Sequence, residues 1–413
     1  MRPLGELTEN FDARRVPVKE VDRRPGPYPY YGASGVVDHV DDYLFDGEYL
    51  LIAEDGENLR TSNTPVAFLA RGKFWVNNHA HIVRGNDQAD TRYLMYALRA
   101  TDVTGYLTGS TMPKLTQGSM NRILLPAPEI SEQRAIAHIL GTLDDKIEQN
   151  RRMGETLEAM ARALFKSWFV DFDPVRAKAE GRETTLPKEV VALFPDRYDD
   201  SEMGEIPVGW RVGGFRDVVE LLRDQDNPLG SPNALFSHYS IPAFDEGQMP
   251  KAEAGHTIKS LKFRVPAAVV LVSKLNPEIE RVWMVDVRPN ERPVCSTEFL
   301  VLRGRPPFTR GYIYCLARSP GFRQQIERLV TGTSKSHQRA QAESVLNLRV
   351  VVPPAGFARA FEHFAELLLA RTLDCRRESA TLASLRDALL PKLVSGEVRV
   401  KDVKRLAGSA GVA

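Results

Sequence analysis

Two polar loops contain the residue types with which proteins hold a nucleic-acid backbone. The first reads GSTMPKLTQGSMNRI at 109–123, and the second reads TGTSKSHQRAQAE at 331–343. Small hydroxyls, glycine and cations suit a loop that approaches phosphates, and such contacts position a protein without reading sequence. A solvated charged loop is the alternative, but two loops of one type favour phosphate contact. The candidate residues are Thr111, Lys114, Gln117, Arg122, Ser334, Lys335, Ser336, His337 and Arg339.

Two further segments in the first half could reach base edges. PYPYYGASG at 27–35 combines aromatic and small polar residues, with Tyr30, Tyr31 and Ser34 as candidates. The alternative is an edge strand with tyrosine in the core. GKFWVNNHAHIVRG at 72–85 places Asn77, Asn78 and His79 in a polar break between apolar strands. Asparagine can pair bidentately with adenine in the major groove, although an Asn-rich hairpin turn is an equal alternative.

Charge is distributed unevenly along the chain. The net charge is only +1, so no global basicity indicates a nucleic-acid partner. Between residues 303 and 339, however, eight Lys or Arg residues face a single acid, Glu327. Such a local excess can hold a phosphate backbone. Lys274, Asn276 and Arg281 are weaker candidates, because a lone surface cation is usually only solvated.

The residues that surround these loops repeat along the chain. Five segments recur in the same order at an offset between 219 and 227 residues. Five matches at nearly constant offset indicate duplication of a unit of roughly 200 residues, rather than a solenoid of short units. The pairs are HIVRG 81–85 with LVLRG 300–304, YLMYALR 93–99 with YIYCLAR 312–318, LTGST 107–111 with VTGTS 330–334, ILLPAP 123–128 with VVVPPA 350–355, and ETLEAMARALFKSWF 155–169 with ATLASLRDALLPKLV 380–394.

Each half ends in a long amphipathic helix. In the first, apolar residues recur at spacings of three and four from Ile136 to Trp168, with Met160 on the stripe. Ser131 suits a helix start, and Asp173-Pro174 suits a stop, because a residue before proline resists the helical region. In the second, a stripe extends from Phe361 to Leu389 and includes Leu385. A seam of this kind predicts a coiled coil, with core helices of a bundle as the alternative.

Motifs for catalysis are missing from the chain. There is no GxxxxGK[ST] loop, no GxGxxG turn after a strand, no Asn-Pro-Pro-aromatic motif and no HExxH. Cys295, Cys315 and Cys375 are odd in number and widely spaced, which favours ordinary buried thiols over a disulfide framework or zinc site. We therefore expect no enzyme activity and no metal or cofactor in this chain.

The compartment is inferred from the same kind of absence. No apolar run approaches the roughly 18 to 20 residues that span a bilayer. The start, MRPLGELTENFDARR, lacks the apolar centre of a signal peptide. We expect a cytoplasmic protein without membrane contact.

With these segments in view, the chain resembles the specificity subunits of type I restriction–modification systems. The most specific segment is LPAPEISEQRAIAHILGTLDDKIEQNRRMGETLEAMARALFKSWFVDFDPV at 125–175, which is similar to that family's first long helix. IPVGW at 206–210 resembles the entry to a target recognition domain, and LRDALLPKLVSGEV at 385–398 resembles the end of the second helix. One departure is the amino terminus, which reads RPLGELT instead of a Pro-x-Gly-Trp phrase, so the first strand is expected to be shortened or differently built.

The resemblance implies an α+β fold. Two α/β target recognition domains, related by the internal repeat, would be separated by two long antiparallel helices that form a coiled-coil spacer. The expected boundaries are a first recognition domain at 1–128, a first helix at 129–178, a linker at 179–208, a second recognition domain at 209–354, a second helix at 355–397 and a flexible tail at 398–413.

The resemblance also implies partners. Each recognition domain would read one half of a bipartite double-stranded DNA target, and the helices would dock two methyltransferase subunits. Those subunits would bring S-adenosylmethionine for adenine methylation, and separate restriction subunits would bring ATP- and magnesium-dependent translocation and cleavage.

Two other classes of protein remain as alternatives. A nuclease or methyltransferase needs an acidic cluster or an Asn-Pro-Pro-aromatic motif, and neither is visible in the sequence. A coiled-coil scaffold without a DNA role predicts no salt-dependent DNA binding and leaves the repeated loops unexplained. DNA recognition accounts for both the repeat and the loops.

Overall fold

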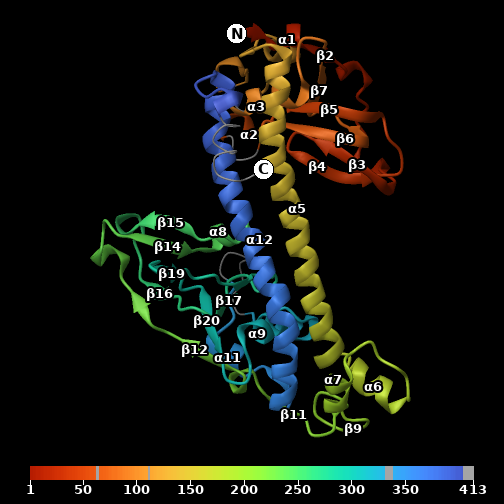
Figure 1. The fold of residues 1–413 in the computed structure, drawn as a ribbon, viewed down its shortest axis with the longest axis vertical. Helices are drawn as coiled ribbons and strands as arrows, with labels where there is room; N and C mark the ends of the chain where they lie inside the picture. The colour runs from red at the N-terminus through yellow and green to blue at the C-terminus, as the bar shows by residue number, and fades with distance from the viewer. Residues whose placement is uncertain (62–64, 110–111, 331–337, 403–413) are drawn as a thin grey trace. The chain divides into compact units, whose positions relative to one another are not determined.

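A computed structural model describes residues 1–61, 65–109, 112–330 and 338–402 (Figure 1). The chain divides into two compact units. The first unit consists of Met1–Glu148 and Thr381–Ala413, and the second consists of Gln149–Ala380. Two long helices, α5 (Ile130–Phe169) and α12 (Ala355–Ser395), contribute residues to both units.

The first unit is built on a six-stranded sheet in the order β2-β7-β5-β6-β3-β4. Its central strand, FDGEYLLIA, is buried on both faces because alternate side chains enter different clusters. Leu50 and Ile52 pack in one cluster, whereas Tyr49 and Leu51 pack in the other. The strands are β2 (Thr8–Asn10), β3 (Pro25–Gly32), β4 (Gly35–Val40), β5 (Phe45–Ala53), β6 (Ala67–Val76) and β7 (Ala80–Gly85).

Short helices cover one face of this sheet. The Asp90 side chain caps α3 by accepting hydrogen bonds from the backbone N–H groups of Arg92 and Tyr93. The apolar face of α3, including Tyr93 and Leu94, packs in the same cluster as Leu50. The remaining elements are α1 (Leu4–Leu7), α2 (Asn58–Thr61), α3 (Thr91–Arg99), α4 (Gln117–Asn121) and the antiparallel pair of β1 (Arg2–Pro3) and β8 (Leu124–Leu125).

The second unit contains two larger sheets. A four-stranded sheet has the order β12-β20-β17-β18, and a five-stranded sheet has the order β13-β16-β19-β14-β15. The strands of the first are β12 (Val219–Leu222), β17 (Val269–Ser273), β18 (Val282–Met284) and β20 (Phe299–Gly304). Those of the second are β13 (Gln225–Asp226), β14 (Leu235–Tyr239), β15 (Lys251–Ala254), β16 (Lys262–Arg264) and β19 (Pro293–Cys295).

Shorter elements complete the second unit. They are the pair of β11 (Arg211–Gly214) and β21 (Arg349–Val352), the 3-10 turn η4 (Phe215–Asp217), and the helices α8 (Ile241–Asp245), α9 (Arg310–Ala317), α10 (Pro320–Arg328) and α11 (Ala342–Leu346). β1 in the first unit has two residues, whereas β11 has four. β1, whose amino-terminal sequence was expected to give a shortened strand, is therefore shorter than its counterpart β11.

The two units share one strand and helix plan, which confirms the duplication. β5 pairs with β7 and β6 in the first unit, as β17 pairs with β20 and β18 in the second. β2 and β12 are the matching edge strands, and α3 and α9 are the matching helices. The glycine that ends β7 and the one that ends β20 have the same role, because a Cβ at Gly85 or Gly304 would meet a backbone carbonyl oxygen at 2.1 or 2.2 Å.

The segment expected to be a linker is folded and packs against the core of the second unit. The first long helix ends at Phe169, four residues before Asp173, and α6 (Asp173–Ala179) and α7 (Lys188–Leu193) follow. β9 (Tyr198–Asp199) pairs with β10 (Ile206–Pro207). The Phe194 ring is buried and makes edge contacts with Trp168 and Phe357. Aromatic burial therefore fixes a segment that its prolines and charges indicated to be a linker.

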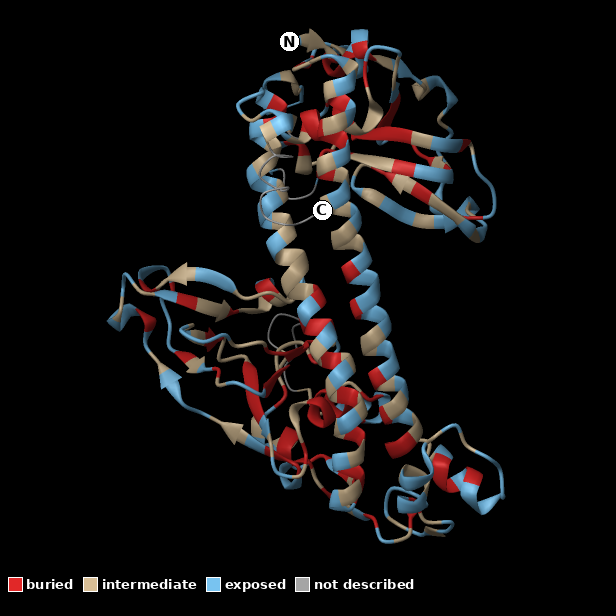
Figure 2. Ribbon diagram, in the orientation of Figure 1, coloured by how far each residue is buried: buried red, intermediate tan, exposed pale blue. Residues whose placement is uncertain are grey.

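The long helices pair antiparallel within the second unit. Going forward along α5, Asn150, Gly154 and Phe165 face Glu378, Thr372 and Phe361 in turn. Most of the residues on this seam are buried, with Glu378 half-buried, whereas many residues on the outer faces are exposed (Figure 2). Two residues of the predicted stripes are exposed: Met160 in the second unit by 52%, and Leu385 in the first unit by 47%. These positions lie toward the edges of stripes drawn from sequence spacing alone.

Two other expectations can be checked within the described residues. Cys295, Cys315 and Cys375 are buried free thiols, as predicted, and burial raises the pKa of the Cys295 and Cys315 thiols to about 12. No helix in the described part of the chain is both long and apolar enough to cross a membrane.

Candidate nucleic-acid interface

In the first unit, polar side chains gather where β5 ends. Asp55 follows this strand and forms an isolated antiparallel bridge with Lys114. The His79 Nδ1 lies 2.8 Å from the Asp55 carboxylate, and the Lys114 ammonium lies 3.3 Å from Glu54. His79 and Lys114 side chains are exposed by 53% and 51%. The turn between β6 and β7 and the loop before α4 therefore present an imidazole and an ammonium group close together at one end of the sheet.

A buried ion network lies beneath this edge. The His81 ring is almost fully buried, with Nδ1 at 2.6 Å from Asp12 and Nε2 at 2.7 Å from the Leu115 carbonyl oxygen. Arg15 donates to both Glu54 and the Ala80 carbonyl at 2.8 Å. Glu54 also contacts the Lys114 ammonium, and Leu115 is the next residue after Lys114. The network therefore fixes the backbone that carries this exposed cation.

Charge and hydrogen bonding shift the pKa values of the buried pair. Burial lowers the pKa of His81, but the bonds to Asp12 and Leu115 and the charges of Asp12 and Glu54 raise it above its ordinary value overall. Burial raises the pKa of Asp12, but the bonds from His81 and the Ile82 N–H bring it below its ordinary value. Both ring nitrogens of His81 face acceptors, so the network favours the protonated ring.

The other predicted residues of the first half are only partly at this edge. The Tyr31 carbonyl accepts from the Asn77 N–H, and Asn78 is exposed. The Asn77 side chain, however, is buried and accepts from the His79 N–H, which is the turn geometry of the alternative interpretation. Tyr30 is in the core, where its hydroxyl bonds to the Val18 backbone.

The remaining described candidates of this half are exposed. Ser34 is exposed in the turn between β3 and β4, and Gln117 is exposed at the start of α4. Arg122 is exposed and donates to the Ser119 hydroxyl. Thr111 lies outside the described residues.

The second unit has the same construction where β17 ends. Leu275 forms an isolated antiparallel bridge with Arg339, as Asp55 does with Lys114. The Arg339 guanidinium makes a forked pair with Glu298 at 3.0 to 3.2 Å. The backbone of Lys274 bonds to Glu298 and Ala340, and the Asn276 N–H donates to the Gln338 carbonyl. The fold thus brings Arg339 beside Lys274 and Asn276, although Arg339 is more than sixty residues away from both in the sequence.

Arg281 has a structural environment instead. It is 7% exposed, and its guanidinium makes two hydrogen bonds of 2.8 Å to the Asp245 carboxylate. Arg339 is also paired with a carboxylate, but its side chain is 40% exposed, whereas the Arg281 side chain is buried and is therefore not available to a phosphate. Ser334, Lys335, Ser336 and His337 lie outside the described residues.

The acids that hold the cations were missed in the sequence. Glu54 and Glu298 each accept an exposed cation at a strand end, and neither was a candidate. Glu54 follows β5, whereas Glu298 precedes β20, so the two acids lie at different places of the repeated plan and comparing the halves position by position would not have paired them.

Fold and site together define a duplicated α/β protein with paired long helices and a cation-bearing strand end in each unit. Residues 1–159 match the family described as the type I restriction modification DNA specificity domain. The chain is 25% identical over 368 residues to the type I restriction enzyme MjaIX specificity subunit of Methanocaldococcus jannaschii, covering 86% of this chain and 80% of that protein. It is 26% identical over 420 residues to the HindI specificity subunit of Haemophilus influenzae, covering 86% and 84%.

A solved structure has the same fold. The crystal structure of the type I restriction–modification S subunit from M. genitalium matches with a TM-score of 0.60 at 15% identity, covering 95% of each chain. The family match over residues 1–159 and the similarity to specificity subunits along most of the chain support an S subunit of a type I restriction–modification system.

Proposed function

We propose that this protein selects the DNA sequence on which a type I restriction–modification complex acts. The observation that carries the proposal is the repeated strand-end site, in which Asp55 with Lys114 and Leu275 with Arg339 form the same bridge. Duplicated sites of one design, joined to different neighbouring sheets, suit a protein that reads two different half-sites of double-stranded DNA.

The two kinds of contact have different tasks in this proposal. Lys114 and Arg339 hold phosphates, which supplies affinity and salt dependence. In this proposal Asn78 and His79, near Lys114, reach base edges, where an asparagine amide can discriminate adenine. Sequence preference then differs between the units because the sheets beside the two sites differ. The first unit adds β3 and β4 to its sheet, whereas the second has a separate five-stranded sheet.

The long helices carry the partner proposal. Met153 and Met160 are exposed by 38% and 52% and are seven residues apart on α5, so both lie on one face. Exposed apolar residues at this spacing suit the docking of a partner helix or groove. We assign this face to a methyltransferase subunit, two copies of which would serve the two half-sites. The helices themselves act as a spacer between the recognition domains.

The chemistry belongs to the partners in this proposal. Methyltransferase subunits supply S-adenosylmethionine and methylate adenine, and restriction subunits supply ATP- and magnesium-dependent translocation and cleavage. This chain needs no cofactor or metal of its own, and the described residues contain no group of His, Cys, Asp or Glu suited to a metal ion. A cytoplasmic location follows from this role.

Methylation mapping tests the proposal directly. The chain is co-expressed with its methyltransferase partner, and modified adenines are located by sequencing the host DNA. We expect one bipartite sequence to be methylated on both strands, and exchange of residues 1–128 for those of a relative should change only one half of it. Methylation without any sequence preference would contradict the proposal.

A further inference from the structure

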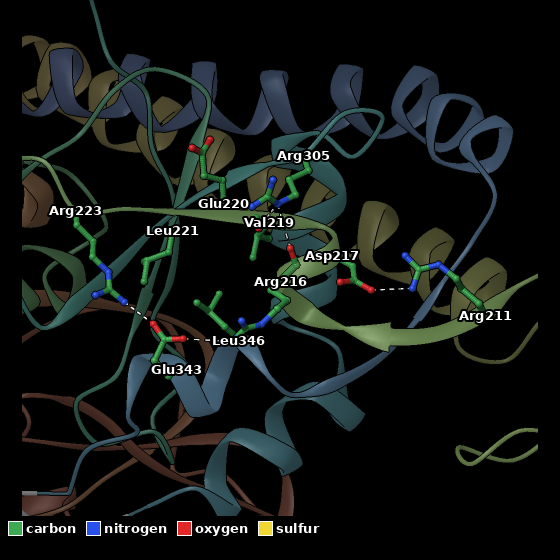
Figure 3. A pocket seen from close by; sticks show the side chains of 10 residues that line it. All are labelled: Arg211, Arg216, Asp217, Val219, Glu220, Leu221, Arg223, Arg305, Glu343 and Leu346. Carbon is green, nitrogen blue, oxygen red and sulfur yellow. Dashed lines mark hydrogen bonds and ion pairs between the residues drawn. The ribbon is translucent and has the colours of Figure 1, made fainter.

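A pocket in the second unit holds four arginines and three acids. It is lined by η4, β12, the residue after β20 and α11, and its volume is about 670 Å³ (Figure 3). Its charged residues are Arg211, Arg216, Arg223, Arg305, Asp217, Glu220 and Glu343. None of these was a candidate in the sequence, and the cations outnumber the acids.

Glu343 joins two of these arginines. One carboxylate oxygen lies 3.2 Å from an Arg216 nitrogen, and the other lies 2.6 Å from an Arg223 nitrogen (Figure 3). The three side chains are exposed by 49% to 64%. A carboxylate that gives one oxygen to each of two guanidiniums occupies the position of a phosphodiester group, whose two free oxygens would take the same partners.

The other two arginines of the pocket, Arg211 and Arg305, have partners other than Glu343 and do not contribute to the position between Arg216 and Arg223. Arg211 pairs with Asp217 at 2.7 Å. The Arg305 Nε donates to the carbonyl oxygens of Arg216 and Val219, which fixes the turn that carries Arg216. The pocket therefore contains one anion position, between Arg216 and Arg223, and Glu343 fills it.

One arginine of this anion position, Arg223, lies at the same end of the sheet as the strand-end site, whereas Arg216 precedes β12 at the opposite end. β12 and β17 both pair antiparallel with β20, so they run in the same direction and end at one edge. Arg223 follows β12 as Lys274 follows β17, and Glu343 comes four residues after Arg339. A DNA backbone held by Arg339 and Lys274 would continue toward Arg223.

We propose that Arg216 and Arg223 form a phosphate clamp for the DNA backbone, with Glu343 as the internal anion that a phosphodiester replaces. The proposal rests on the DNA-binding function proposed above and extends it to named residues. Exposed ion pairs contribute little free energy, so replacing Glu343 by a phosphodiester costs little. At matching positions the first unit has Asp12 after β2 and Gly118 in α4, so the clamp distinguishes the second unit.

The test compares variants of opposite expected sign in the full chain, using a mixed-sequence duplex as the probe. The variant R216A/R223A should bind more weakly, and the slope of log K against log salt should fall in magnitude by about 1, the value for one phosphate. Glu343→Gln should instead bind about threefold tighter at low salt, because no internal anion competes. The control R182A/R197A removes two exposed arginines elsewhere in this unit and should leave the slope unchanged.

The outcomes separate this proposal from the proposed function. If the wild-type chain shows no salt-dependent binding, the proposed function fails. If the wild type binds DNA but R216A/R223A and Glu343→Gln keep its affinity and salt slope, only the clamp is overturned. The pocket would then hold only the Glu343 carboxylate and no DNA phosphate. An equal loss in R182A/R197A would also overturn the clamp, because the effect would then be one of net charge. Far-UV circular dichroism and thermal unfolding check that each variant is folded.

Discussion

Arg339 lies opposite Leu275 in an isolated antiparallel bridge, and its guanidinium is held by the Glu298 carboxylate. The arrangement places a loop cation at the end of a central strand. The same bridge between Lys114 and Asp55 in the first unit shows that the arrangement is part of the repeated plan. Preorganising a cation beside an acid reduces the conformational entropy that is lost when a phosphate binds.

Removing either bridge cation should weaken DNA binding without regard to sequence. Lys114→Ala and Arg339→Ala should each lower the magnitude of the salt slope by about 1, as expected for a phosphate contact. Fluorescence anisotropy over a series of salt concentrations measures the slope. Lys188→Ala, an exposed change in α7, serves as the control. If both variants had the same salt slope as wild type, the strand-end site would not be part of the DNA interface.

Changing Arg281 should affect stability and not DNA binding. Arg281→Met keeps most of the buried stem but leaves the Asp245 carboxylate without its forked partner. We expect a loss of about 1 to 2 kcal/mol in the free energy of unfolding, measured in urea, with an unchanged salt slope. If Arg281→Met kept the stability of wild type but had a salt slope of lower magnitude, Arg281 would be a phosphate contact after all.

The His81–Asp12 pair should make the first unit sensitive to pH. The pKa of His81 is raised above 6.5, so its contribution to stability is present below that pH and is lost as pH rises through the folded-state pKa. The pKa of Asp12 is lowered below 3.8, so its contribution is present above that pH and is lost as pH falls through the folded-state pKa. Both contributions are complete between pH 3.8 and pH 6.5.

The measurement is the difference in Tm between wild type and His81→Gln across this range. Breaking a buried charged pair costs about 3 kcal/mol, so the difference should be largest inside the window and should narrow as pH rises above it. His39→Gln, on exposed β4, is the matched control and should shift Tm little. A difference that stays constant with pH would show that His81 is not held in its protonated form.

Sequence predicted the repeated frame well because periodic burial is a local property. HIVRG and LVLRG became β7 and β20, and the matching Tyr-containing segments became α3 and α9. It failed where a side chain's partner is distant: Arg281 finds Asp245 36 residues away. Asn77 showed the other limit, because an asparagine in a turn and one on a base edge have the same local sequence. Phe194 was assigned to a linker because only tertiary packing buries its ring.

The exposed methionines of α5 should be needed for partner binding. Burying two methionines contributes enough free energy that Met153→Lys/Met160→Lys should weaken methyltransferase binding by at least about tenfold. Biolayer interferometry with the purified partner measures the Kd. Leu235→Lys/Leu261→Lys is the control, since both leucines are exposed by 67% and 49% away from the long helices. Equal losses in both variants would indicate a general effect of added charge.

The spacer proposal predicts a change in the recognised sequence. Inserting seven residues after Glu148 in α5 and seven after Ala380 in α12 keeps the apolar seam in phase, because the seam repeats every seven residues. Seven helical residues add about 10 Å, or about 3 base pairs of duplex. Sequencing of methylated adenines should therefore give the same two half-sites with a gap longer by about 3 base pairs. The matched control carries the insertion in α5 alone, which shifts the seam by one repeat and should abolish methylation, whereas an unchanged gap in the double insertion would contradict a spacer role for these helices.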